Sequence, residues 1–60
     1  MKVMLKTSLS KDQRGAAICA GFSFSHIYFV EYEKFLDGVL CYKLVGGYIY
    51  LADYFEELTE

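Results

Sequence analysis

The strongest structural signal in the chain lies in residues 39–54, which read Val39-Leu-Cys-Tyr-Lys-Leu-Val45, Gly46-Gly47, Tyr48-Ile-Tyr-Leu-Ala-Asp-Tyr54. Two runs rich in strand-forming residues are separated by only two glycines, a connection that is typical of a β-hairpin. We therefore expect an antiparallel hairpin with strands at residues 39–45 and 48–53.

A two-residue turn at Gly46-Gly47 also predicts how the two strands pair. It places Val45 opposite Tyr48, and every further pair follows from that one. Because side chains alternate along a strand, the hairpin then has two distinct faces. The predicted core face consists of Leu40, Tyr42, Leu44, Ile49 and Leu51. The other face consists of Cys41, Lys43, Val45, Tyr48, Tyr50 and Ala52, and is covered either by a partner or by a second layer of this chain.

Length and composition predict one small domain over residues 1–60. A domain of 60 residues buries only about 60% of the surface that its unfolded chain exposes, so its stability is marginal without further support. The chain is 55% hydrophobic and contains six Tyr and five Phe. We therefore expect some apolar surface to remain exposed or to be covered in a homodimer.

The charges are unevenly distributed along the chain. Residues 1–14 contain four basic side chains and one acid, whereas residues 31–60 contain seven acids and two lysines. This acidic half favours a partner with a basic surface, such as a nucleic-acid-handling protein, and argues against a duplex-binding protein. A binder of single-stranded nucleic acid remains an alternative, since tyrosines next to Lys43 are suited to stacking on bases.

The uncharged stretch from Gly15 to Val30 is the only segment that raises the question of a membrane. It has 16 residues, fewer than the ~20 apolar residues that span a bilayer, and polar residues interrupt it. The N-terminal residues lack the apolar core of a secretory signal. The two cysteines, Cys19 and Cys41, form no Cys-x-x-Cys pair, so reduced thiols are expected. These features predict a cytoplasmic protein with no membrane partner.

The first 25 residues contain a strand signal and a helix signal. Val3, Leu5 and Thr7 alternate with more polar neighbours, which predicts a first strand. Ser10 and Gln13 form a possible capping box, which indicates a short helix ending at Gly21. A loop followed by a second strand is the alternative, because Gly15 is unfavourable inside a helix. Phe22 and Phe24 alternate with serines, which is also a strand pattern.

Residues 26–36 are compatible with either a helix or a strand. The aromatic and aliphatic side chains at 28, 29, 32, 35 and 36 lie on one side of a helix, with Asp37-Gly38 as its end. The same residues are good strand formers, and Asp37-Gly38 is also a favoured hairpin turn. Simple pairing across that turn would put Glu31 and Glu33 on the apolar face of the hairpin. We therefore favour a helix here.

The C-terminal residues predict one more short element. Asp53 and Glu56 resemble a capping arrangement, so a helical turn is expected at residues 54–59, with Phe55 and Leu58 folded back on the sheet. The fold class predicted from all these signals is α+β: one small domain with an antiparallel sheet, the hairpin at 39–45/48–53, and one or two short helices.

No set of residues in the sequence predicts catalysis, a metal site or a cofactor. His26 is the only histidine, and its neighbour Ser25 does not by itself form a nucleophile and base pair. Cys19, Cys41 and His26 do not have the spacing of a zinc site. Gly46-Gly47 lacks the following lysine and helix of a phosphate-binding loop. We therefore predict that the protein is not an enzyme.

The sequence instead predicts a small non-catalytic protein-binding module. Tyrosine is enriched at protein interfaces because it combines a large contact area with a hydroxyl group. In size and composition only, the chain is similar to the small inhibitors that phages and mobile elements direct against host or defence proteins. A homo-oligomer that binds a small molecule is a further alternative. The predicted partner-binding residues are Tyr48, Tyr50, Lys43, Val45, Glu56, Glu57 and Glu60.

Overall fold

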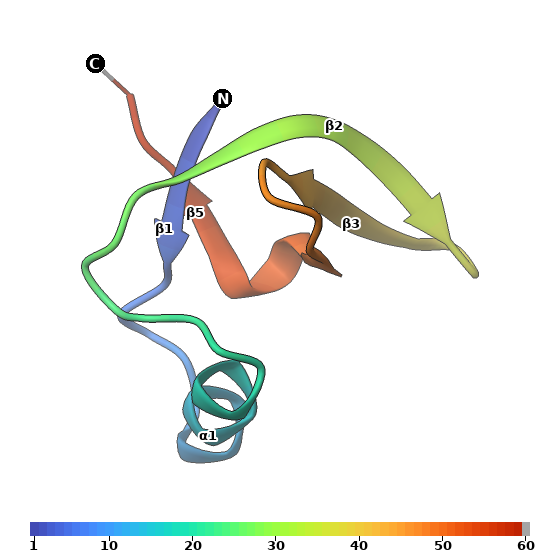
Figure 1. The fold of residues 1–60 in the computed structure, drawn as a ribbon. Helices are drawn as coiled ribbons and strands as arrows, with labels where there is room; N and C mark the ends of the chain where they lie inside the picture. Colours follow the sequence, from blue (N-terminus) through green and yellow to red (C-terminus); the bar gives the residue numbers. More distant parts are fainter. Residues whose placement is uncertain (60) are drawn as a thin grey trace.

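The computed structural model describes residues 1–59, which form five strands, one α-helix and one 3-10 turn (Figure 1). The strands form one antiparallel sheet in the order β4-β3-β2-β1-β5. The expected α+β class with an antiparallel sheet is thus confirmed in its broad form, although most of the ordered structure is strand. The elements are β1 (Lys2–Leu5), α1 (Lys11–Cys19), β2 (Tyr28–Leu36), β3 (Val39–Leu44), β4 (Ile49–Leu51), η1 (Ala52–Tyr54) and β5 (Phe55–Glu57).

Strand β2 joins the two halves of the sheet and arches over the molecule (Figure 1). Its first residues pair with β1, with Tyr28 opposite Val3, and from Val30 onwards it pairs with β3. The register shifts between Val30 and Tyr32, which makes Glu31 the extra residue of a β-bulge. A bulge bends a strand and increases its twist, and this explains how one strand belongs to both halves.

The helix expected near residues 26–36 is wrong, because this segment is strand β2. The bulge removes the objection to strand pairing at Glu31, since this extra residue places Val30 beside Leu44, while Glu33 pairs with Tyr42 and remains exposed to solvent. The turn that follows has Leu36 opposite Val39, with Asp37 at φ 50° and Gly38 at φ 79°. Two consecutive positive φ angles fit the right-handed twist of a tight hairpin, so the turn signal and the strand formers agree.

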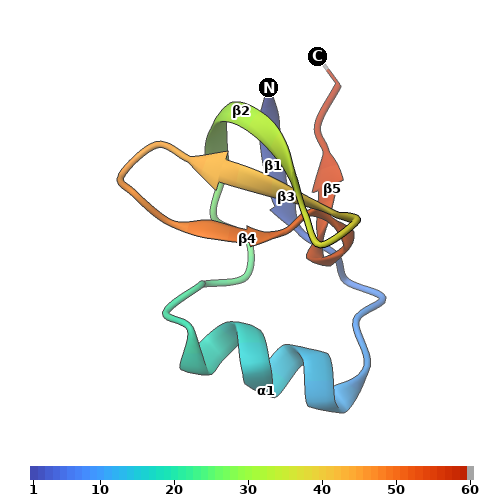
Figure 2. The ribbon, with the colours of Figure 1, turned by 90° about the vertical axis from the view of Figure 1, so that its right-hand side faces the viewer.

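The first helix is confirmed, and it follows the predicted signals closely. Ser10 is its N-cap, its hydroxyl accepts a hydrogen bond from the Gln13 N–H, and the Gln13 side chain accepts one from the Ser10 N–H. After the helix, Gly21 adopts φ 96°, a left-handed conformation that glycine tolerates. Figure 2 shows α1 as a separate layer on one side of the sheet.

The second hairpin is present, but its predicted register is wrong by one residue. Leu44 donates its N–H to the Tyr48 carbonyl over 2.7 Å, so the loop contains three residues instead of two. Gly46 and Gly47 both have positive φ, 108° and 107°, which accommodates this longer loop. As a result Tyr42 pairs with Tyr50. A slip of one residue exchanges the faces of a strand, so β4 presents the opposite side to the one predicted.

The segments before β2 and after β4 also differ from expectation. Residues 22–25 form a loop instead of a strand. The helical turn expected at residues 54–59 is wrong: the turn is η1, at Ala52–Tyr54, and Phe55–Glu57 is strand β5, which pairs with β1. Phe55 is nevertheless buried, as predicted. Pairing with β1 satisfies backbone groups that a short isolated helical turn would leave to water.

The core lies between the two halves of the sheet and α1, and Phe22 is at its centre. Its ring is 4.8 Å from Tyr50, 5.3 Å from Tyr28 and 5.5 Å from Phe55, measured between centroids. The predicted core positions of the first strand, Val3 and Leu5, are fully buried. The buried core residues are Val3, Leu5, Leu9, Ala17, Phe22, Leu44 and Phe55.

Candidate protein-interaction surface

The side of strands β2, β3 and β4 that points away from Phe22 forms a continuous surface, here called the outer face. Tyr42 and Tyr50 pack on the core side, so alternation puts their strand neighbours on the outer face. The pairing aligns them in rows: Lys43 lies between Tyr32 and Ile49, Cys41 between Lys34 and Leu51, and Val39 beside Leu36. The outer face thus consists of Tyr32, Lys34, Leu36, Val39, Cys41, Lys43, Ile49 and Leu51.

The outer face is largely apolar and exposed. Its five large hydrophobic side chains, those of Tyr32, Leu36, Val39, Ile49 and Leu51, are between 38% and 50% exposed. Phe29 and Val45 are also exposed, and they lie next to each other beyond the bulge, because Val45 donates its N–H to the Phe29 carbonyl. Together these side chains expose on the order of 500 Å² of apolar surface, as much as the largest patch on a typical monomer, and such patches mark interaction sites.

The outer face contains two lysines, of which one is already paired within the chain. Lys43 Nζ lies 2.9 Å from Glu31 Oε2 and also donates to the Leu44 carbonyl over 3.0 Å. This lysine therefore already has two acceptors within the chain. Cys41 is buried among its neighbours, and its thiol donates to the Val39 carbonyl. Lys34, which is exposed on β2 opposite Cys41, is thus the one lysine of the face without an ion pair among the described residues, and apolar side chains lie on both sides of it along β2.

The structure separates the residues predicted to share one partner-binding face. Tyr50 packs on the core side, 4.8 Å from Phe22 and 5.1 Å from Tyr54, whereas Lys43 belongs to the outer face. Tyr48 lies on the same side as Tyr50, with its ring 5.8 Å from Phe22, yet it is 59% exposed. The predicted common face of Lys43 and Tyr50 is therefore not formed, because the hairpin register differs by one residue.

The predicted acidic residues are located at the other edge of the sheet. Glu56 and Glu57 are exposed on β5, opposite Met4 and Val3, and Glu60 lies outside the described residues.

Burial, followed by the negative charges of Glu33 and Glu57, raises the pKa of Tyr42 above its ordinary value of 10.0. Tyr42 therefore keeps its proton at neutral pH and is a hydrogen-bonding group, not a base.

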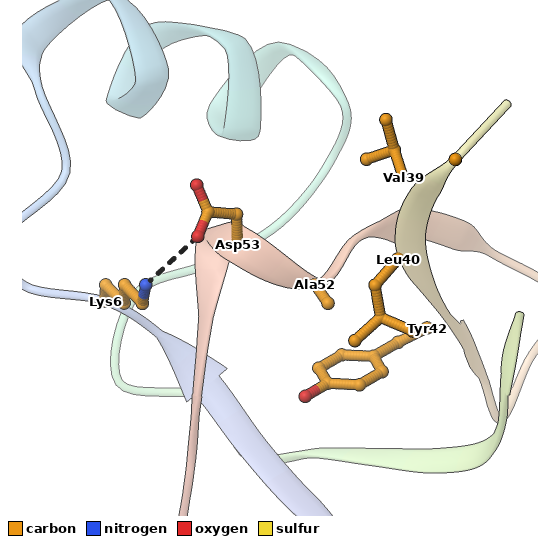
Figure 3. Close-up of a pocket in the computed structure, with 7 residues that line it drawn as sticks. Lys6, Val39, Leu40, Tyr42, Ala52 and Asp53 are labelled. Carbon is orange, nitrogen blue, oxygen red and sulfur yellow. Dashed lines mark ion pairs between the residues drawn. The ribbon is translucent and has the colours of Figure 1, made fainter. Parts of the chain in front are cut away.

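An open pocket of about 480 Å³ lies beside Tyr42 at the far end of the β2–β3 hairpin (Figure 3). Leu40, Val39 and Ala52 make its apolar part, and Lys6 Nζ lies 3.6 Å from Asp53 Oδ1 at its side. These two charges already pair with each other. The pocket therefore offers apolar contact and the Tyr42 hydroxyl group, and it holds no nucleophile next to a base.

The remaining candidate groups lie apart from one another. His26 is exposed and its ring is 4.6 Å from that of Tyr28. Cys19 is exposed on α1, whereas Cys41 is buried in β3. Among residues 1–59 no group of three or more His, Cys, Asp or Glu side chains has the geometry to hold a metal ion. In the same part of the chain, no helix has both the length and the apolar character needed to cross a membrane.

Sequence reasoning missed Ile49 and Leu51 as surface residues, since it placed them in the core. The two consecutive glycines were a signal for a longer loop, because a three-residue hairpin loop with glycine is the next most common type after two-residue loops. Glu31, between strand formers, was the corresponding signal for a bulge.

No protein-family model, curated protein or solved structure matches the chain.

Proposed function

We propose that the protein is a small non-catalytic protein-binding module that docks through its outer face. The observation that carries this proposal is the group of exposed apolar side chains that β2, β3 and β4 present on one face, around the buried Cys41 and the paired Lys43. Single exposed hydrophobic residues are common on any protein, but a contiguous patch of this size is not. A rigid sheet presents such a patch with little loss of conformational entropy on binding.

The partner that best fits this surface is a larger protein with an apolar patch bordered by basic residues. Residues 31–60 contain seven acids and two lysines, and Lys43 is already paired with Glu31. Glu31 and Asp37, both exposed, lie at the margin of the outer face. Among the described residues, the unpaired charge at this margin is that of Asp37, which attracts a basic rim, while Glu56 and Glu57 at the opposite edge of the sheet contribute to long-range steering of the encounter. By occupying such a site the protein acts as an inhibitor or an adaptor.

The experiment compares two double variants, of which the control removes side chains that are at least as exposed as those removed from the outer face. Tyr32→Ser/Ile49→Ser changes the outer face, whereas Phe35→Ser/Tyr48→Ser changes exposed residues that point to the other side of the sheet. A stoichiometric partner is first captured from lysate, purified and titrated calorimetrically against each folded variant. We expect the outer-face variant to lose about tenfold or more in affinity and the control to stay close to wild type.

Three results would contradict the proposal. The outer-face variant could be folded and bind the purified partner as wild type does. The control alone could lose affinity, which would place the binding site around Tyr48 instead. Alternatively, capture could retain no protein while a single-stranded oligonucleotide binds with affinity that falls steeply with salt, which would favour the nucleic-acid alternative.

A further inference from the structure

Strand β4 forms one free edge of the sheet, beside β3 (Figure 2). The Leu44 N–H donates to the Tyr48 carbonyl, and in an antiparallel pair the residues that face the neighbouring strand alternate. Tyr50 therefore also directs its N–H and carbonyl towards β3. Ile49 and Leu51 direct theirs outwards, so both offer a donor and an acceptor at the edge.

This edge lacks the features that normally prevent a strand from pairing with another chain. Residues 44–52 include no charged side chain and no proline, although charged residues and proline are the usual protection of edge strands. The opposite edge has that protection, because Glu56 and Glu57 lie on β5 and Asp53 lies just before it. The two edge strands of this small sheet thus differ: β5 carries acidic side chains, whereas β4 carries no charge that would prevent pairing with another strand.

We propose that β4 pairs antiparallel with β4 of a second copy of this chain and joins the two sheets across a two-fold axis. The outward groups fix the register: Ile49 exchanges two hydrogen bonds with Leu51 of the second copy, and Tyr50 lies on the axis opposite its equivalent. This pairing is self-complementary, because the symmetry reproduces the same two bonds on the other side.

The charges favour a second copy as the occupant of this edge. In the proposed register Asp53 lies opposite Gly47 of the second copy, and no two carboxylates meet along the strand. A protein of net charge −2 can therefore associate with itself here without placing like charges opposite each other. Paired residues point to the same side of a sheet, so the dimer carries both outer faces on one side. This inference goes beyond the proposed function and does not depend on it.

The test uses proline at a position whose backbone already suits it. Leu51 has φ −63°, which is the angle that proline adopts. Leu51→Pro removes the outward N–H and leaves the hydrogen bonds between β4 and β3 in place. Leu51→Ala is the matched control, since it removes the same side-chain contacts and keeps the N–H. Sedimentation equilibrium over a wide range of protein concentration measures the dimer dissociation constant of each variant.

We expect wild type and Leu51→Ala to dimerise with similar dissociation constants, and Leu51→Pro to dimerise at least roughly tenfold more weakly, because two hydrogen bonds per dimer are lost. The inference is overturned if wild type is monomeric throughout, or if folded Leu51→Pro dimerises as the alanine variant does. A wild-type monomer whose partner capture is abolished by Leu51→Pro but kept by Leu51→Ala would instead assign the edge to a strand of another protein.

Hydrogen exchange of the wild-type protein gives a second readout that does not require the proline variant to fold. The amides of Ile49 and Leu51 should exchange slowly at concentrations where the dimer predominates and rapidly after dilution, while the Tyr50 amide stays protected in both states. Rapid exchange of Ile49 and Leu51 in a sample shown to be dimeric overturns the proposed pairing. Such a result would place the dimer interface elsewhere.

Discussion

Lys43 Nζ lies 2.9 Å from Glu31 Oε2 and thereby connects the bulge of β2 to the neighbouring strand β3. Glu31 is the residue that the bulge adds to β2, so its side chain leaves the alternation that its neighbours follow. Val30 then faces Leu44 in the core, while Tyr32 pairs with Lys43 on the outer face. The ion pair thus marks the position where the sheet turns from one half to the other.

Removing Glu31 altogether should be far more damaging than removing its charge. Deletion of the residue leaves Val30 opposite Leu44 but eliminates the bulge, so β2 loses the bend with which it pairs with both β1 and β3. We therefore expect a loss of about 2–3 kcal/mol of stability. Glu31→Ala keeps the backbone and loses only a partly exposed ion pair, which costs about 1 kcal/mol or less. Urea unfolding measures both. A deletion variant as stable as Glu31→Ala would show that β2 joins the two halves of the sheet without needing the bend of the bulge.

Phe22 should be the most sensitive single position in the core. It is 5% exposed and contacts four other aromatic rings, so Phe22→Ala should destabilise the fold by about 3–5 kcal/mol. For a domain this small, such a loss approaches the whole stability. Phe35→Ala is the control, because Phe35 is 69% exposed and its removal should change stability by less than about 0.5 kcal/mol. Thermal unfolding followed by circular dichroism gives the comparison. Equal effects at both positions would contradict the placement of Phe22.

The same substitution at two glycines should change stability in opposite directions. Gly38 has φ 79° in the turn between β2 and β3, so Gly38→Ala should cost about 1 kcal/mol or more. Gly15 lies inside α1 with open space where its side chain would be. Gly15→Ala should therefore stabilise the protein by about 0.5–1 kcal/mol. Urea midpoints of the two variants test the sign of each effect, and two shifts in the same direction would count against the assigned backbone conformations.

Stability should fall as the pH rises above about 10, partly because of Tyr42. Its folded-state pKa is raised above the ordinary value of 10.0 by burial and by Glu33 and Glu57. The folded state therefore holds the phenol proton more tightly than the unfolded state, and this contribution is lost as the pH rises through the folded pKa. Urea midpoints at neutral pH and at several alkaline values should show a smaller alkaline decline for Tyr42→Phe than for wild type. Identical declines would exclude this role for Tyr42.

Local signals in the sequence were sufficient for several elements of the fold. The capping box at Ser10 and Gln13, the left-handed Gly21 and the alternation at Val3 and Leu5 each correspond to an element in the structure. These signals depend on contacts between residues only a few positions apart, so no knowledge of the rest of the chain is needed. The glycine signal at residues 46–47 likewise located the second hairpin, although its loop is one residue longer than predicted, whereas Asp37-Gly38 was assigned to the end of a helix.

The surface that we propose for binding was not accessible to such reasoning. Ile49 and Leu51 were assigned to the core face, and Tyr50 to the opposite face, covered either by a partner or by a second layer, on the basis of a two-residue turn. In the structure the loop is one residue longer, and all three assignments are reversed. Likewise, the apolar residues of β2 fitted a helix until Glu31 was accommodated in a bulge. Each error came from a single residue of register.

The amino-acid sequence alone was enough to specify where the first helix begins, that a hairpin turns near Gly46-Gly47 and that one small α+β domain results. The three-dimensional packing settled which side of each strand faces the core. The physical reason is the period of two along a β-strand: a shift of one residue exchanges both faces at once. Which shift prevails depends on the burial of Phe22, Tyr28, Tyr50 and Phe55 against one another. These aromatic residues come from distant parts of the chain and meet only in the folded protein.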